Sequence, residues 1–413
     1  MGASLIKKLR ELCQVVSSEG QGHNAAVILA SPGLTNIVVD NEAFTQELVS
    51  WLGEHEGGQF HLLSAIVDGI PASLSSKKTP SEGIAVLRGP SDVILPQLGN
   101  PEFLRDRRDH DTVGALSFSG LGDPSSSTIA VPLTRTIFHN ARPSTLIASR
   151  FDLTTPGTPR LIESGEAVRQ HINLADSTVS GGKSSRRQPH LWLPLTSVSS
   201  SRKVTESFGN ILRRLDHDGK SSPASSELEA NIGTIRKAIL DASPEVETAL
   251  PGVWAVVDPT PGETINFRNW QIDHPRDVDM VSGGGGWGDK AGLLSLDPET
   301  SPFAASEEEN MRNLFGIGGA SDYAPVGSEV QFFVPDLVAG ESHPHDSHGL
   351  LFGVSRYDPG TTTAAEPLVD QQEADIAVTP GRFGVLCEEG IYVSGEDARP
   401  FKLSVPGSLV SIP

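Results

Sequence analysis

Two apolar runs decide how the first third of this chain folds: AAVILA at Ala25–Ala30 and HLLSAIVD at His61–Asp68. Short runs that are almost entirely apolar are typical of strands buried on both faces of a sheet. The segment between them, 41–52, carries apolar residues at helical spacing, and Asn41 is placed to cap a helix. A strand, a helix and a second strand in this order predict a parallel pair joined by a crossover helix.

Further short apolar runs, bounded by glycine, proline and serine, predict more strands along the chain. In the first half they follow a helix predicted within residues 1–18 and lie at 84–88, 114–119, 128–133 and 145–149. In the second half, helices are predicted at 205–215 and 226–240, before strands at 253–257, 293–296, 330–334, 350–354, 376–378, 383–387, 391–393 and 401–405. We therefore predict a mixed α/β (α+β) fold of two packed halves, 1–200 and 201–413, each with helices followed by a β-rich sheet.

Charge and cysteine content restrict the class of protein. The 413 residues hold 52 acidic and 32 basic side chains, a formal net charge of −20, so a surface for nucleic acid, which needs clustered Lys and Arg, is not expected. The two cysteines, Cys13 and Cys387, have neither disulfide nor zinc spacing. No run of 18 apolar residues predicts a transmembrane helix. We expect an intracellular protein, cytoplasmic or mitochondrial, with no membrane span.

The most distinctive segment is SGGGGWGDKAG at Ser282–Gly292. Consecutive glycines let a backbone approach a ligand closely, and successive N–H groups in such a loop can bind an anion. The known nucleotide motifs do not fit, because Asp289 interrupts the spacing and Ala291 follows the lysine. We predict a ligand-binding loop whose candidate residues are Gly284, Gly285, Gly286, Trp287 and Lys290. The alternative is a tight turn before a buried strand, with the tryptophan as a packing residue.

A second candidate binding segment is RTIFHNARPSTLI at Arg135–Ile147. Arg142 can bind a carboxylate through two parallel hydrogen bonds. Polar side chains beside it add further hydrogen-bonding groups: Asn140, Ser144 and Thr145. Together with Lys290, the segment predicts a site for a small anionic ligand. The alternative is an ordinary polar connection between strands, in which Pro143 fixes the turn.

A histidine cluster, His343, His345 and His348, is the densest group of potential metal ligands. Imidazole groups suit zinc, iron or manganese. Pro344 interrupts the strand that such a site would need, so we predict neither a metal nor another cofactor. A metal-dependent enzyme built on these three histidines stays as an alternative. No Gly-x-Ser-x-Gly motif marks a catalytic serine, and Cys387, followed by two acids in an apolar run, is predicted to be a core residue.

Several short motifs resemble a FIST domain (F-box and intracellular signal transduction) of the fungal type: Ile66–Pro71, Glu82–Gly89, Val131–Thr134, Arg142–Leu146, Gly283–Pro298 and Gly381–Leu386. The first four are similar to the N-terminal FIST domain, and the last two to the C-terminal parts of fungal FIST-like proteins. The resemblance implies an intracellular sensory module for small ligands such as amino acids, and it carries over no catalytic residues. The sequence shows no F-box segment before the first strand, which argues against a ubiquitin-ligase function.

Three functions are compatible with these observations. The one we favour is a non-catalytic sensor or scaffold that binds a small anionic ligand or a protein partner. The second is the metal-dependent enzyme, and the third is a structural or assembly subunit of a mitochondrial complex. The residues leave the ligand, the partner and the oligomeric state open.

Overall fold

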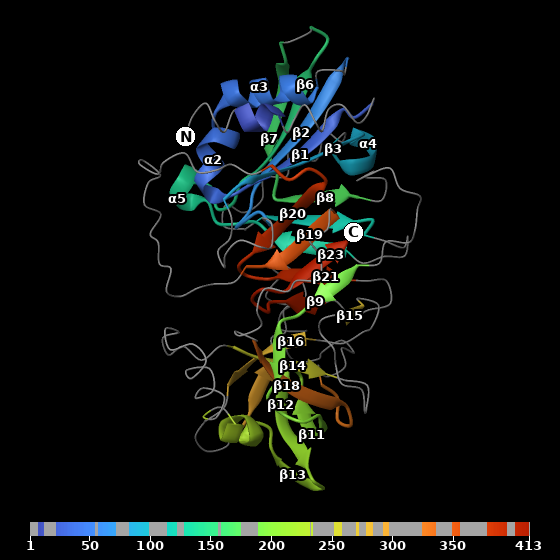
Figure 1. Cartoon of the computed structure of the whole chain (residues 1–413). Helices are drawn as coiled ribbons and strands as arrows, with labels where there is room; N and C mark the ends of the chain where they lie inside the picture. The colour runs from blue at the N-terminus through green and yellow to red at the C-terminus, as the bar shows by residue number, and fades with distance from the viewer. Residues whose placement is uncertain are drawn as a thin grey trace. The chain divides into compact units, whose positions relative to one another are not determined.

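Strands dominate the structure. The computed structural model describes residues 7–11, 22–53, 57–71, 82–98, 114–121, 128–155, 158–174, 189–231, 233, 252–257, 270–271, 278–283, 292–296, 324–335, 349–355, 378–394 and 401–412. Strands account for 51% and helices for 17% of the described residues. Figure 1 shows the strands as the main element of both units. The predicted mixed α/β fold, with helices followed by a sheet in each half, is therefore wrong.

The chain forms two compact units, each assembled from segments that are distant in sequence. Unit 1 contains residues 1–189, 343–389 and 410–413, and unit 2 contains residues 190–342 and 390–409. The boundary predicted after residue 200 lies within unit 2.

The central sheet of unit 1 has the strand order β3-β1-β2-β6-β7. Its strands are β1 (Ala25–Ala30), β2 (Gln59–Ile66), β3 (Ile84–Gly89), β6 (Leu146–Asp152) and β7 (Arg160–Glu166). β1 and β2 run parallel with Ala25 opposite His61, which confirms the predicted parallel pair. β3 and β6 flank that pair in antiparallel orientation, and β7 is antiparallel to β6. Every residue of β1 is buried, as expected for a strand covered on both faces.

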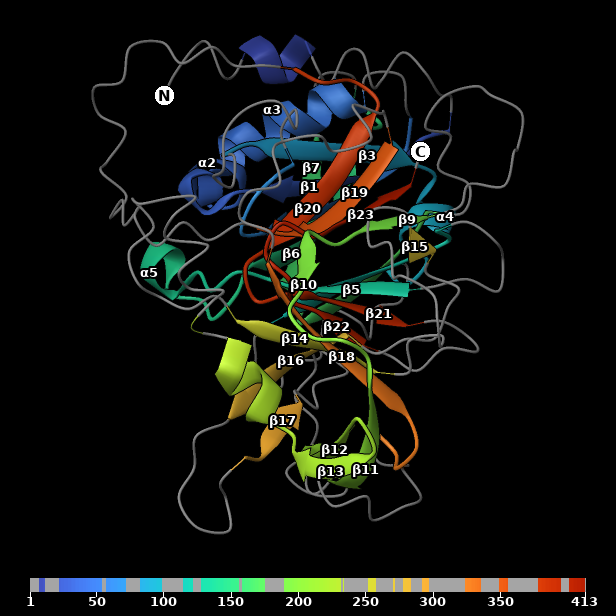
Figure 2. The same cartoon turned by 60° about the horizontal axis from the view of Figure 1, so that its bottom comes forward.

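Helix α3 (Glu42–Leu52) covers one face of this sheet. Asn41 caps it as predicted, because its side-chain oxygen accepts a hydrogen bond from the N–H of Phe44 at 3.1 Å. Two short turns, η1 (Pro32–Leu34) and α2 (Thr35–Val38), lead into the helix. Helix α3 lies beside β1 and β2 in Figure 1, and beside β1 in Figure 2. The core between helix and sheet includes Ile28, Leu34, Val38, Phe44, Leu48, Leu52, Phe60, Leu62, Ile66 and Phe151.

Unit 1 has further strands outside the central sheet, and an aromatic cluster around Phe118 joins some of them. These strands are β4 (Ala115–Ser119), β5 (Thr128–Pro132), β8 (Arg169–Asn173), β19 (Gly349–Val354), β20 (Arg382–Cys387) and β23 (Leu409–Ile412), with the short helices α4 (Ser91–Ile94) and α5 (Ile137–Asn140) nearby in sequence. β4 pairs with β5 antiparallel and with β8 parallel, while β19 and β20 form another parallel pair. The Phe118 ring centroid lies 4.8 Å from that of Phe352 and 6.4 Å from that of Phe383. Cys387 is buried here, which confirms its predicted place in the core.

The largest sheet of unit 2 is antiparallel and closes on itself. Its strands are β10 (Leu195–Ser197), β11 (Arg202–Phe208), β12 (Ile211–His217), β13 (Lys220–Pro223), β14 (Val253–Val257), β16 (Val278–Gly283), β17 (Leu294–Leu296) and β18 (Glu329–Pro335). The order β18-β11-β12-β17-β16-β14 returns to β18, since Trp254 on β14 pairs with Phe333. Closure removes unpaired strand edges and encloses an apolar core. That core includes Val204, Leu212, Leu215, Ala255, Val257, Leu294, Leu296, Val330 and Phe332.

Two further antiparallel strand pairs belong to unit 2. The first joins β9 (His190–Trp192) to β15 (Trp270–Gln271), and the second joins β21 (Ile391–Ser394) to β22 (Phe401–Leu403).

The helix predicted at 205–215 is instead the β11–β12 hairpin, and this is one reason why the predicted fold class fails. The chain turns at Gly209 and Asn210, and Gly209 has a φ of 58°, which glycine adopts without steric cost. Gly-Asn between apolar runs is a hairpin signal that the helical interpretation overlooked. The helix-like spacing of Leu212 and Leu215 arises because β-bulges shift the register and place both side chains in the core.

Candidate functional site

The glycine loop and the histidine cluster lie outside the described residues. This applies to Gly284, Gly285, Gly286, Trp287 and Lys290, and equally to His343, His345 and His348. The strands on either side of the loop are described: β16 ends at Gly283, which lies opposite Leu294 at the start of β17. The loop therefore connects two adjacent antiparallel strands. Among the described residues, no three His, Cys, Asp or Glu side chains are arranged to hold a metal ion.

The structure brings the residues of the second predicted segment together at the turn between α5 and β6. Thr136 and Thr145 are fully buried, and their hydroxyl oxygens are 2.6 Å apart. In the amide orientation that satisfies both of its ends, the Asn140 oxygen accepts from Nη1 of Arg142 and from Oγ1 of Thr145, each at 3.0 Å. Ser144 Oγ accepts from the N–H of Gly114 at 2.7 Å. These hydrogen bonds hold the turn in one conformation.

Arg142 itself is held between two carboxylates. Its Nη1 lies 3.0 Å from Oδ1 of Asp40, and its Nε lies 2.8 Å from Oε1 of Glu166. An anionic ligand would have to displace both carboxylates from the guanidinium. Anion binding at this segment stays a prediction. The observed contacts give the polar residues another role, because they stabilise the turn.

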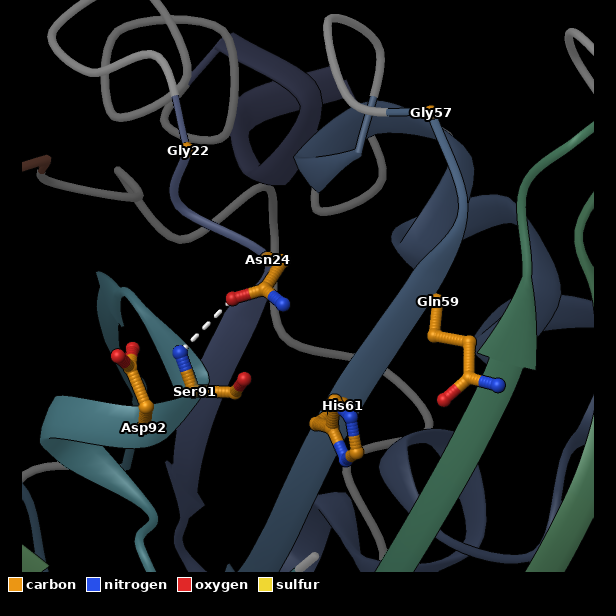
Figure 3. A pocket seen from close by; sticks show the side chains of 7 residues that line it. All are labelled: Gly22, Asn24, Gly57, Gln59, His61, Ser91 and Asp92. Atoms are coloured by element: carbon orange, nitrogen blue, oxygen red, sulfur yellow. Dashed lines mark hydrogen bonds between the residues drawn. The ribbon is translucent and has the colours of Figure 1, made fainter.

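A polar cavity of about 450 Å³ opens at one end of the central sheet of unit 1 (Figure 3). At this edge β1 and β2 begin and antiparallel β3 ends, so three chain segments contribute side chains. Asn24 precedes β1, and the N–H of Ser91, at the start of α4, donates to its Oδ1 at 2.8 Å. This bond ties α4 to the start of β1. The lining residues are Gly22, Asn24, Gly57, Gln59, His61, Ser91 and Asp92.

His61 is the buried member of the cavity wall, with 8% of its surface exposed. Burial lowers the pKa of its imidazole, and the positive charge of Arg150, opposite it on β6, lowers that pKa further, so the ring is neutral at neutral pH. Its Nδ1 is buried without a hydrogen-bond partner among the described residues. An unsatisfied buried nitrogen costs about 1–3 kcal/mol, and such groups in native proteins require an explanation.

Sequence reasoning missed this site entirely. A local signal existed, because Asn24 and Gln59 are polar residues at the starts of two apolar strands and His61 is a titratable residue inside one of them. Nothing in the neighbouring sequence indicated that residues after β3 would complete the cavity. Ser91 and Asp92 reach the same edge only because β3 pairs with β1 in antiparallel orientation.

Acidification is expected to destabilise the protein through His61. The pKa of the folded state lies below the unfolded value of about 6.5. As the pH falls through the unfolded pKa, the unfolded state takes up more protons than the folded state does. The free energy of unfolding therefore decreases until the imidazole of the folded state also protonates. A His61→Gln variant lacks this titration and should lose less melting temperature than the wild type between about pH 7.5 and about pH 5. Burial also lowers the pKa of His171, so acid destabilises the wild type and the His61→Gln variant alike through that residue. The difference in melting temperature between the two proteins therefore isolates His61. An equal loss in both would contradict a lowered pKa for His61.

Comparison of the chain with protein-family models, with curated proteins and with solved structures finds no match. The resemblance to FIST domains therefore stays a prediction from short motifs. No helix among the described residues is long and apolar enough to cross a bilayer.

Proposed function

We propose that this protein binds a small polar molecule carrying an amino group in the cavity of unit 1, and that the cavity binds it without catalysis. The observation that carries the proposal is His61, a buried neutral imidazole on the cavity wall whose Nδ1 lacks a partner among the described residues. Nδ1 is closed to solvent, so a ligand would have to turn the imidazole toward the cavity before it could donate a hydrogen bond there; that bond would then offset the cost of the unsatisfied nitrogen. Binding of this kind agrees with the sensory role that the FIST resemblance implies.

The size of the cavity suits a small molecule. Its volume of about 450 Å³ lies in the lower part of the range of 300–1,000 Å³ that is usual for such sites. His61 forms a buried part of the wall, whereas Gln59 and Asp92 are exposed. A ligand can therefore enter the cavity from solvent, while the Nδ1 atom of His61 is itself closed to solvent.

The charge of the lining favours an amine over an anion. Among the described residues of the lining, Asp92 is the charged one, and none is Lys or Arg. The Asn24 oxygen already accepts from Ser91, so the amide nitrogen is its remaining hydrogen-bonding group, while Gln59 offers both a donor and an acceptor. An ammonium group fits the carboxylate, and a hydroxyl or carboxylate on the same ligand fits the amide N–H groups. The formal net charge of −20 also attracts cations.

A panel of small ligands tests the proposal by calorimetry and thermal shift. Ethanolamine, glycine and lysine represent amines, while acetate and inorganic phosphate represent anions without one. At a hundredfold excess over its dissociation constant, a bound amine should stabilise the protein by about 2.7 kcal/mol. Acetate and phosphate should produce no shift. A stabilising shift from the anions but not from the amines would overturn the proposed ligand class.

Substituting the carboxylate locates the site. Asp92→Asn removes a charge-assisted hydrogen bond worth about 1.5–3 kcal/mol, so the dissociation constant for the amine should rise by roughly 10- to 100-fold. Glu42→Gln is the matched control, because Glu42 occupies the first turn of α3 as Asp92 does in α4, but lies outside the cavity. Equal loss of affinity in both variants would place binding elsewhere.

A further inference from the structure

A histidine on β8 is held between two serines of the neighbouring strand β4. The strands are parallel with Ser117 opposite His171, so Ser117, Ser119 and His171 lie on one face of the sheet. Nδ1 of His171 lies 3.0 Å from Ser117 Oγ, and Nε2 lies 2.9 Å from Ser119 Oγ. Both ring nitrogens are therefore hydrogen-bonded to hydroxyl groups.

The contacts of Ser117 favour one tautomer of His171. The Ser117 hydroxyl lies 3.5 Å from the main-chain oxygen of Gln170 and can donate its proton to it. In that arrangement Ser117 accepts from the imidazole, and Nδ1 carries the ring proton. Nε2 of the neutral ring then has a lone pair, to which the Ser119 hydroxyl donates. The hydrogen bonds thus run in one direction, from Ser119 through His171 and Ser117 to the Gln170 carbonyl.

Burial keeps the His171 imidazole neutral, and the two serines and the histidine still remain partly exposed. Burial lowers the pKa of His171, which favours the neutral ring at neutral pH. Phe118 and Ile172, on the opposite face of the same strands, are fully buried. The two serines and the histidine face the other way and are half-buried. Part of each of these side chains is therefore accessible to solvent.

We propose that Ser119 is a nucleophilic serine that accepts acyl groups from small carboxylic esters, with His171 as its base and Ser117 as a positioning residue for the imidazole. A nucleophile needs a base within about 2.6–3.2 Å and a third group that orients the base. Ser119, His171 and Ser117 supply these three parts in the right order. This site is separate from the cavity of unit 1 and does not depend on the function proposed for it.

The reaction has two steps. Ser119 Oγ attacks the ester carbonyl carbon and gives its proton to Nε2 of His171; the bond to the ester's alkoxy oxygen breaks, and the alcohol leaves with that proton. Water then attacks the acyl-serine, with His171 accepting its proton and returning it to Ser119 Oγ. The products are one alcohol and one carboxylic acid for each ester and water consumed.

A second serine pair in the same unit provides an internal control. Ser149 and Ser164, on β6 and β7, are hydrogen-bonded to each other at 2.9 Å. Ser164 is exposed on its strand, and its recorded partner is a hydroxyl rather than an imidazole. If exposure were enough for reactivity, Ser164 would react at least as fast as Ser119.

Covalent labelling of the full chain with a fluorophosphonate probe tests the proposal. The probe forms a bond between phosphorus and the serine oxygen and releases fluoride. Peptide mapping by mass spectrometry should find the adduct on Ser119 and not on Ser164. His171→Gln should slow labelling by about 100-fold, since it removes the base, while Ser164→Ala should label at the wild-type rate. Labelling spread over several serines, or unchanged in His171→Gln, would overturn the proposal.

A cysteine variant keeps the test decisive if loss of the serine hydroxyl disturbs folding. Ser119→Cys preserves the size of the side chain, and a basic imidazole at 2.9 Å should promote its alkylation by iodoacetamide, with loss of iodide. Adding His171→Gln should slow that alkylation at least about tenfold. Cys387 is buried and should not compete, and peptide mapping separates the adduct on the Ser119→Cys side chain from one on Cys13. Equal rates with and without the histidine would show that the contact only packs the two strands together.

Discussion

Alanine in place of Gly384 is expected to unfold unit 1 under conditions where the wild type is native. Gly384 lies opposite Leu351 in the parallel pair of β19 and β20, and an added Cβ would collide with the Leu351 carbonyl oxygen. Backbone atoms cannot rotate away as a side chain does, so the two strands would have to separate and lose their hydrogen bonds. Overpacking typically costs about 1–3 kcal/mol, and a clash with backbone belongs at the upper end of that range. Such a loss is a large part of the 5–15 kcal/mol typical of native proteins.

Denaturant unfolding of Gly384→Ala and Gly233→Ala measures this effect against a matched control. Gly233 is helical, and a Cβ there meets nothing within 4 Å, so its alanine variant should match the wild type or gain up to about 1 kcal/mol. If Gly384→Ala unfolded at the same denaturant concentration as the wild type, β19 and β20 would not be paired in this register.

Truncation of Phe118 to alanine is expected to cost about 3–5 kcal/mol of unfolding free energy. The side chain is fully buried, and its ring contacts both Phe352 and Phe383, on two strands more than 200 residues further along the chain. The variant would leave a cavity and lose two aromatic contacts, each worth about 0.5–1.5 kcal/mol beyond the buried area. Loss of this ring therefore weakens the link between β4 and the pair β19–β20.

Phe138→Ala is the control for that measurement. Phe138 lies on α5 with 98% of its surface exposed, so its truncation should change the unfolding free energy by no more than about 0.5 kcal/mol. Similar losses in Phe118→Ala and Phe138→Ala would contradict the aromatic core around β4. Thermal and denaturant unfolding of the two variants side by side distinguish the outcomes.

The elements that the sequence predicted correctly are those whose evidence lies in consecutive residues. β1 is apolar at every position because both of its faces are covered, and α3 has a capping asparagine and an apolar face at helical spacing. β14 was found for the same reason as β1. β7 was missed because most of its residues are exposed, and it therefore has no apolar run. β11 and β12 were taken for a helix because their bulges imitate helical spacing.

The candidate sites depended on contacts between residues far apart in sequence. Arg142 was predicted to bind an anionic ligand, but the carboxylates that contact it, Asp40 and Glu166, come from other segments. His171 lies 54 positions from Ser117, and neither belongs to a recognised motif. Nothing in the local sequence could indicate that these side chains meet.

The sequence by itself determined the local structure of this protein: which runs are buried, where α3 begins, and that Cys387 belongs to the core. These follow from hydrophobicity and backbone hydrogen bonding over a few neighbouring residues. Only the tertiary structure decided that strands dominate, that the main sheet of unit 2 closes through β14 and β18, and that the cavity forms at one edge of the β3-β1-β2 sheet. The physical reason is that strand pairing joins residues distant in sequence, so the order and register of the strands decide which polar side chains meet.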